Sequence, residues 1–236
     1  MSCCKVFVRV RPLIINEAIN WAVLEWEVDI ITISIALSEK TYDINAELDH
    51  ALSPKTTGKG KIVFAAAGNR GANKQREWPA RKPGVIAIHA TDGRGEAPNI
   101  NPPREGNHNF ATLGHDINMR WPCKGEGSKF EDMYISGTSF STPIAAGMAA
   151  NVLEFARHRL KLSEWEQPRF YSHNGMRKIL AEMAVRQQNG YDYLRPWRLW
   201  EEAFEGTWGD KEKLDLFPGD PENICEVLRF IVGFSD

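Results

Sequence analysis

The stretch SFSTPIAAGMAANVL, residues 139–153, is dominated by small and apolar residues. A helix of this composition has no wide polar face, which is typical of a helix buried on all sides rather than one lying at the surface. Pro143 fits the first turn of such a helix, where its missing N–H leaves no hydrogen bond unmade. The sequence therefore predicts a central, buried helix that begins close to Ser139.

Patterns typical of alternating strands and helices precede this segment. The near-continuous run of Ile30, Ile31, Ile33 and Ile35 favours a strand covered by helices on both faces, as in parallel sheets. Strands are expected at residues 5–10, 29–35, 62–67 and 85–90, and helices at 14–26 and 44–52. This order predicts an α/β layer structure, in which functional groups gather at the carboxyl ends of the strands.

The following segments are less regular. Residues 91–129 are rich in Gly, Pro and Asn, so we expect mostly loop with short strands near Phe110 and Ile117. A helix is expected at residues 175–185. The aromatic residues that follow it favour a tail that packs back onto the domain, the alternative being an exposed surface that binds cations or peptides. They are Tyr191, Tyr193, Trp197, Trp200, Phe204 and Trp208.

Length and composition restrict the class of protein. A chain of 236 residues with 42% hydrophobic residues suits one main core. A net charge of -2 gives no basic face for nucleic acid and no polybasic membrane anchor. The chain lacks an apolar run of about 20 residues and a signal-like opening, so we expect no membrane partner and favour a cytoplasmic location. The oligomeric state is left open.

The cysteines do not indicate a metal site or a disulfide framework. No pair has the spacing of metal ligands, and the chain is not dense in cysteine. We therefore expect free thiols at Cys3, Cys4, Cys123 and Cys225.

Gly137, Thr138 and Ser139 lie where the central helix is expected to begin. A serine at a helix N-terminus lies beside free backbone donors, which can stabilise a developing anion and make the serine a useful nucleophile. Ser and Thr are also the preferred helix caps, so this motif taken alone is more often structural.

A second polar residue lies at the end of a predicted strand. The segment AAAGN, residues 65–69, closes a buried strand with Asn69. A side-chain amide aimed at a developing oxyanion stabilises acyl-transfer transition states. The alternative for Asn69 is an ordinary turn residue.

Together these segments resemble the subtilisin-like serine protease family (subtilases, peptidase family S8). The similarity rests on AAAGN and GTSFSTP, with PGVIAIHATD and FATLGHDI between them, and it runs from about residue 14 to about residue 153. The resemblance implies an incomplete subtilisin-like three-layer α/β fold, with a mostly parallel sheet flanked by helices. It also implies a partial peptidase domain at residues 1–160. The helical and aromatic residues beyond it predict an extension at 161–236 that packs on this domain.

The resemblance assigns roles to individual residues. Ser139 matches the nucleophile, and Asn69 matches the side-chain donor of the oxyanion hole, with the Ser139 amide as second donor. Where the family usually has glycine this chain has Ala36 and Leu37, whose side chains would narrow the peptide groove. The expected substrate-binding residues are Ser34, Ile35, Ala36, Ala66, Ala67, Gly68, Gly137 and Thr138, and residues 65–68 would line the primary specificity pocket.

Two members of the family's catalytic triad are missing. The family's histidine precedes Gly-Thr and its aspartate begins an Asp-Thr/Ser-Gly turn, and neither motif occurs here. None of the histidines, at positions 50, 89, 108, 115, 158 and 173, lies in such a context. Family order places both residues upstream of this segment, so a missing upstream part explains both absences. It would also leave an unpaired apolar sheet edge, which predicts poor solubility of the isolated chain.

The expected function is therefore peptide-bond hydrolysis by a serine endopeptidase, through an acyl-enzyme at Ser139. We expect the chain alone to be nearly inactive, because the general base is missing. The alternative is a non-catalytic peptide-binding or regulatory module. No cofactor is required for this chemistry; the resemblance makes calcium conceivable, but no EF-hand-like carboxylate spacing occurs.

Overall fold

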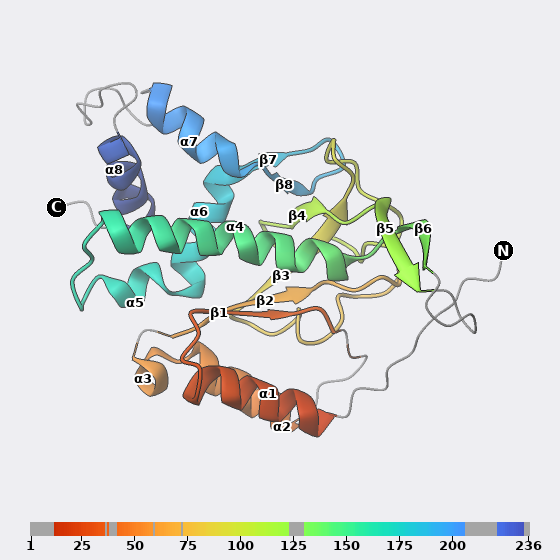
Figure 1. The fold of residues 1–236 in the computed structure, drawn as a ribbon, viewed down its shortest axis with the longest axis horizontal. Helices are drawn as coiled ribbons and strands as arrows, with labels where there is room; N and C mark the ends of the chain where they lie inside the picture. Colours follow the sequence, from red (N-terminus) through yellow and green to blue (C-terminus); the bar gives the residue numbers. More distant parts are fainter. Residues whose placement is uncertain are drawn as a thin grey trace.

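The computed structural model describes residues 12–35, 37, 42–58, 60–71, 73–122, 130–205 and 221–233. Its main sheet has six strands in the order β1-β2-β3-β4-β8-β7 (Figure 1). Strands β1 to β4 and β8 are parallel, and β7 runs antiparallel to β8. The strands are β1 (Ile30–Ile33), β2 (Ile62–Ala66), β3 (Val85–Thr91), β4 (Phe110–Leu113), β7 (Ala184–Arg186) and β8 (Asp192–Leu194).

Helices cover both faces of this sheet (Figure 1). Helices α1 (Pro12–Leu24), α2 (Tyr42–Leu52) and α3 (Pro54–Thr57) lie on one side. On the other side lie α4 (Thr138–Arg159), α5 (Gln167–Phe170), α6 (His173–Met183) and α8 (Pro221–Val232). Helix α7 (Pro196–Glu205) follows β8 and packs on α8. The predicted three-layer α/β fold is confirmed.

The pleat of β2 explains the two cores. Successive side chains of a strand point to opposite faces. Ile62 and Phe64 pack with the α4, α6 and α8 side, whereas Val63 and Ala65 pack with α1 and α2. Every residue of β2 is buried, as its unbroken apolar sequence predicts for an interior parallel strand.

Strand β1 differs from this pattern because it is the last strand on its side of the described sheet. Ile31 and Ile33 are buried under α1 and α2, but Thr32 is exposed. The expectation of cover on both faces therefore holds for only part of the isoleucine run.

Helix α4 crosses the sheet as the central helix that the sequence predicts, and it extends to Arg159. It is not buried on all sides: Pro143, Gly147 and Asn151 are exposed. Its small residues serve one close-packed face, where Ala145 and Ala149 are fully buried, because small side chains let the helix approach the sheet closely.

A β-hairpin lies outside the main sheet. Strand β5 (Ile117–Pro122) pairs in antiparallel register with β6 (Phe130–Ile135). The sequence predicts the first strand but not the second, whose residues are mostly exposed and carry a weak apolar alternation.

The C-terminal part differs from the helical extension that was expected. Strands β7 and β8 complete the sheet, with β8 paired to β4, so residues 184–194 belong to the same layer as the upstream strands. Tyr191 and Tyr193 are buried, as a packed tail requires, whereas Trp197 is 49% exposed. The division at residue 160 stays a prediction.

Several expectations fall on residues that the structure does not describe. They are the strand at 5–10, Cys3, Cys4, Cys123, Ala36, Trp208 and the side chain of Phe204. Cys225 is described, and it is a buried free thiol.

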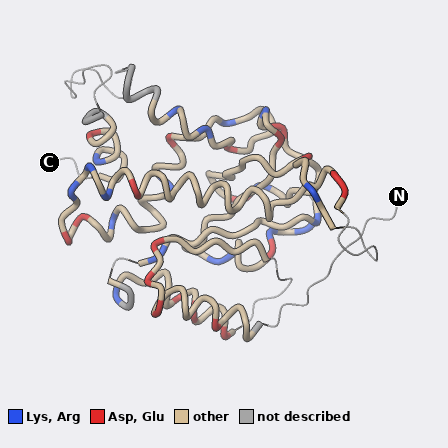
Figure 2. Tube along the Cα trace, viewed as in Figure 1, with Lys and Arg blue, Asp and Glu red and all other residues tan. Residues whose placement is uncertain are grey.

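Charge is unevenly placed on the described elements. Helices α1 and α2 carry acidic residues and no Lys or Arg, whereas both signs occur along α4, α6 and α8 (Figure 2). No helix within the described ranges has the length and apolar character needed to cross a membrane.

Candidate active site

The N-terminus of α4 meets the carboxyl end of β2, which brings Ser139 and Asn69 to one place. The Asn69 carboxamide oxygen accepts hydrogen bonds from the Thr138 backbone N–H at 2.8 Å and from the Thr138 hydroxyl at 3.1 Å. The same hydroxyl accepts a bond from the Gly68 N–H at 3.2 Å. Thr138, which is fully buried, therefore fixes the orientation of the Asn69 side chain.

This orientation leaves the amino group of Asn69 directed toward Gly137. A Cβ atom built on Gly137 would lie 3.3 Å from Asn69 Nδ2. Within the described part of the chain, Nδ2 donates no hydrogen bond. The N–H groups of the first helical turn also lack intrahelical acceptors, and Ser139 is the second residue of α4. The site thus offers a side-chain donor and backbone donors beside the serine hydroxyl, an arrangement that suits an anionic oxygen.

Ser139 is joined to Ser34, which follows β1. The Ser139 hydroxyl donates to the Ser34 carbonyl oxygen at 3.2 Å, and the Ser34 hydroxyl donates to the Ser139 carbonyl oxygen at 3.0 Å. This reciprocal pair joins the end of β1 to the start of α4. The serine hydroxyl therefore faces a carbonyl group and not a base.

No histidine is hydrogen-bonded to Ser139, although all six histidines lie in the described segments. His115 contacts a residue close to the motif: its Nδ1 lies 2.8 Å from the hydroxyl oxygen of Ser136. His89 is fully buried, and burial lowers the pKa of its ring to about 3. Within the described residues, the Ser139 hydroxyl therefore lies beside N–H donors but has no histidine hydrogen-bonded to it.

Gly114 is a supporting residue whose role the sequence reasoning missed. Its carbonyl oxygen accepts a 2.7 Å hydrogen bond from the Gly137 N–H. A Cβ atom at position 114 would lie 2.0 Å from the Ser141 hydroxyl oxygen and 2.9 Å from the Gly137 carbonyl oxygen. Only glycine fits between β4 and the turn that precedes Ser139. Gly114 lies in the segment FATLGHDI, but the need for glycine there depends on contacts with residues distant in the sequence.

The segment expected to bind substrate continues from Ser34 to a contact with Trp78. Leu37 and Trp78 exchange two backbone hydrogen bonds, at 2.8 and 3.0 Å, and a cis peptide bond joins Trp78 to Pro79. Ile35 is partly exposed and packs against the α1–α2 core. The backbone edge of Leu37 is therefore already paired.

The residues expected to line the specificity pocket differ in how deeply they are buried. Ala66 and Ala67 are buried in and just after β2. Gly68 follows with φ +116°, and a Cβ atom there would lie 3.0 Å from Cγ of Glu77. Glu77 is nearly buried, and its carboxylate pairs with Arg70 at 2.6 Å. An acidic side chain beside Gly68 was not anticipated from the sequence.

The described structure therefore brings together Ser34, Gly68, Asn69, Gly137, Thr138 and Ser139 around the start of α4. Ala66 and Ala67 lie behind them, and Ala36 is outside the described residues. No group of three or more His, Cys, Asp or Glu side chains within the described ranges is placed to hold a metal ion.

Two curated relatives of this chain are named as proteases. The chain is 27% identical over 213 residues to the subtilisin-like protease het-Q2 of Podospora anserina, covering 86% of this chain and 57% of that protein. It is 24% identical over 185 residues to the minor extracellular protease Epr of Bacillus subtilis strain 168, covering 76% and 25% respectively. The chain thus spans little more than half of the first relative and a quarter of the second.

Solved structures share the fold. The prenylagaramide maturation protease PagA superposes with a TM-score of 0.59 at 20% identity, covering 96% of this chain and 70% of that one. The patellamide maturation protease PatA gives a TM-score of 0.61 at 22% identity, covering 80% and 68%. The family model described as the subtilase family, peptidase S8, matches residues 9–195. This match takes in every strand of the main sheet, and the chain therefore belongs to the subtilase family.

Proposed function

We propose that this chain is the serine-bearing part of a subtilisin-like serine endopeptidase. The observation that carries the proposal is the cluster of Asn69, Thr138 and Ser139, in which the Asn69 carboxamide is held by its oxygen with its amino group beside Gly137. A helix-capping serine needs no such asparagine. An acyl-transfer site needs it, because the donors must be oriented before negative charge develops.

The chemistry follows from this arrangement. The Ser139 hydroxyl oxygen attacks the carbonyl carbon of a peptide bond, and a base takes the hydroxyl proton. The carbonyl oxygen becomes an oxyanion, held by the Ser139 N–H and by Nδ2 of Asn69. The carbon–nitrogen bond then breaks, the amine leaves with the proton from the base, and water later hydrolyses the acyl-enzyme.

The base must come from polypeptide other than the described residues. In subtilisin, loss of the histidine lowers kcat about 10⁶-fold, so this chain alone should be almost inactive. Strand β1 has one neighbour, β2, within the described sheet, and its carboxyl end reaches Ser34 and Ser139. A further strand that pairs with β1 would end beside the serine, where histidine and aspartate side chains are needed.

Peptide substrates would bind as an extended strand along residues 34–36, ahead of Leu37. Backbone pairing of this kind gives affinity, and side-chain pockets give specificity. The pairing of Leu37 with Trp78 limits the available edge to the residues before it. The Glu77 carboxylate beside Gly68 would add an acidic group to the primary pocket, partly neutralised by Arg70.

The test is active-site labelling of the protein captured from its source, combined with its intact mass. We expect a mass well above 26.7 kDa, and covalent labelling of Ser139 by a fluorophosphonate probe. Ser139→Ala should abolish labelling. Asn69→Ala should slow it about 10²- to 10³-fold, the loss measured for the equivalent donor in subtilisin. Asn151→Ala, on the exposed face of α4, is the matched control and should have no effect.

A second candidate is a peptide-binding module without catalysis. It is favoured by one observation: the Ser139 hydroxyl already donates its hydrogen bond to the Ser34 carbonyl oxygen of the same chain. A source protein of about 26.7 kDa that resists labelling yet binds unstructured peptides would replace the endopeptidase by this module.

A further inference from the structure

A groove lies at the edge of the sheet opposite Ser139. Its walls come from residues 80–87 at the start of β3, residues 105–108 before β4, and one face of α6. These strands begin at this edge, whereas Asn69 and Ser34 follow strand ends, so the groove and the candidate active site lie at opposite edges. The hollow has a volume of about 370 Å³. We call it the cationic groove, after Arg76, Arg81, His108, His173 and Arg177, which line it.

The groove contains more positive than negative charge. Glu105 is its one acidic lining residue among those described, against four Arg and Lys residues and two histidines. Lys82 is already neutralised, because its ammonium group lies 2.6 Å from the Asp49 carboxylate and 2.9 Å from the Asn45 side-chain oxygen. The excess therefore rests on the arginines.

Neither Arg76 nor Arg177 forms an ion pair with an acid in the described ranges. Arg76 donates to two uncharged oxygens, the Glu105 carbonyl at 3.2 Å and Asn109 Oδ1 at 2.6 Å, and its buried Nε has no partner. Arg177 forms no ion pair or hydrogen bond with another residue in the described ranges. Buried donors without acceptors are unfavourable and are usually satisfied by a ligand, water or an ion.

The cations are close enough to repel one another. Burial is the main reason that the pKa of Arg76 is lowered; Glu105 and Tyr191 oppose the change, and the charge of Arg177 adds a smaller lowering effect. Burial likewise lowers the pKa of His173, and Arg177 again adds to the effect. Helix α6 also begins at His173, which brings the positive end of its dipole to the groove. An anion bound here would relieve this repulsion.

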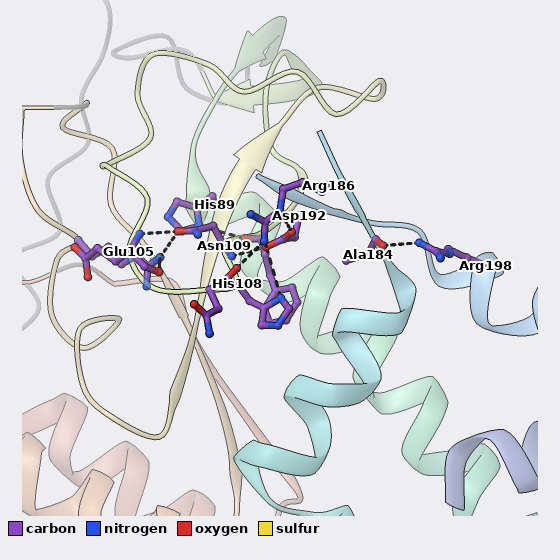
Figure 3. A network of polar contacts seen from close by, with 11 residues as sticks. His89, Glu105, His108, Asn109, Ala184, Arg186, Asp192 and Arg198 are labelled. Atoms are coloured by element: carbon purple, nitrogen blue, oxygen red, sulfur yellow. Dashed lines mark hydrogen bonds and ion pairs between the residues drawn. The ribbon is translucent and has the colours of Figure 1, made fainter. Parts of the chain in front are cut away.

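A hydrogen-bond network holds one wall of the groove in place without a ligand (Figure 3). The buried Asp192 carboxylate accepts the Asn109 N–H at 2.7 Å and pairs with Arg186. Arg186 also donates to the Asn107 carbonyl at 2.6 Å, and Asn109 Oδ1 accepts the Glu105 N–H at 2.7 Å. The loop that carries His108 is therefore fixed from both sides, and a preorganised wall lowers the entropy lost on binding.

We propose that the cationic groove binds a phosphate group. Guanidinium groups present several N–H donors to the oxygens of a phosphate, and here the donors come from separate segments of the chain, as a tetrahedral dianion requires. A second hollow shares Asn107, His108 and Arg177 with the groove and continues to Phe230, which is 49% exposed, and Ile231. The phosphate is therefore either free or carried by an organic group that lies along α8.

Thermal unfolding of the 236-residue chain tests this, with titration of inorganic phosphate or phenyl phosphate against chloride at equal ionic strength. Both phosphates should raise Tm, and chloride should not. Arg177→Gln should weaken phosphate binding about tenfold, the change expected for one charge-assisted contact. Without phosphate the same variant should unfold at or above the parent Tm, because repulsion is relieved. Arg159→Gln removes an exposed helical arginine elsewhere and should bind phosphate as the parent does.

The two sources of phosphate give different results. Tighter binding of phenyl phosphate than of inorganic phosphate, with the advantage lost in Phe230→Ala, identifies a phosphate ester as the ligand. Equal affinities identify free phosphate. The proposal fails if neither compound shifts Tm more than chloride does, or if Arg177→Gln and Arg159→Gln respond alike.

Discussion

At two glycines in and beside the turn before Ser139, the available space rather than backbone propensity determines the residue. Gly114 lies where any side chain would overlap the Ser141 hydroxyl, and Gly137 leaves room beside the amino group of Asn69. The backbone N–H and the hydroxyl of Thr138 both donate hydrogen bonds to the Asn69 carboxamide oxygen. The geometry of the candidate oxyanion site thus depends on neighbours that perform no chemistry.

The glycine at position 114 is open to a matched test. Gly114→Ala should destabilise the fold by about 1–3 kcal/mol, the usual effect of forcing extra volume into a packed site. Gly147→Ala is the control, because a Cβ there meets nothing within 4 Å on the exposed face of α4. It should stabilise the helix by about 0.5–1 kcal/mol. Urea unfolding measures both, and equal effects would contradict this account of Gly114.

At the scale of elements, β1 has an open edge within the described sheet, and α1 exposes several apolar side chains. Strand β1 pairs on one side with β2 within the described sheet, and Thr32 is exposed on it. Helix α1 exposes Leu13, Ile14, Trp21 and Leu24, each by more than half. Apolar side chains beside an open strand edge favour association with other chains.

We therefore expect the isolated chain to self-associate through this surface. Thr32→Lys places a charge on the exposed face of the edge strand, a common natural protection against edge-to-edge pairing, and should shift the protein toward monomer. Asn151→Lys adds the same charge on exposed α4 and should leave association unchanged. Sedimentation velocity over a concentration series measures the result. If both variants associate like the parent, β1 is not the contact.

At the scale of the whole molecule, the buried His89 makes folding stability depend on pH. Its Nδ1 lies 3.2 Å from the Phe110 carbonyl oxygen, its Nε2 is buried without a partner, and its ring lies 5.0 Å from that of Tyr191. It connects β3 with the segment leading into β8. Burial, aided by Arg76, lowers its pKa from 6.5 to about 3.

The sign of the effect follows from where the proton binds. Below pH 6.5 the unfolded chain takes up a proton that the folded protein does not, so stability is full above pH 6.5 and falls as the pH drops toward 3. The loss should approach about 1.4 kcal/mol for each pH unit. His89→Phe keeps a ring beside Tyr191 and should flatten this slope in urea unfolding between about pH 7 and 4. His158→Gln, at an exposed histidine, should keep the parent slope; parallel curves for the parent and His89→Phe would refute the assignment.

The sequence determined the layer order and the central helix, and it pointed to Ser139 and Asn69 as candidate site residues. These depend on local signals: apolar runs such as the one in β2, small residues in α4, and motifs short enough to be read without knowing their surroundings. Strand β6 was not predicted, because exposed strands carry only a weak apolar alternation.

Only the tertiary structure decided the rest. That β8 completes the sheet beside β4, that Thr138 orients Asn69, and that Gly114 must be glycine all depend on residues more than twenty positions apart. The cationic groove likewise joins Arg76, His108 and Arg177 from three separate segments. Such contacts arise when strands pair and helices pack, and no local pattern records which distant residues will meet.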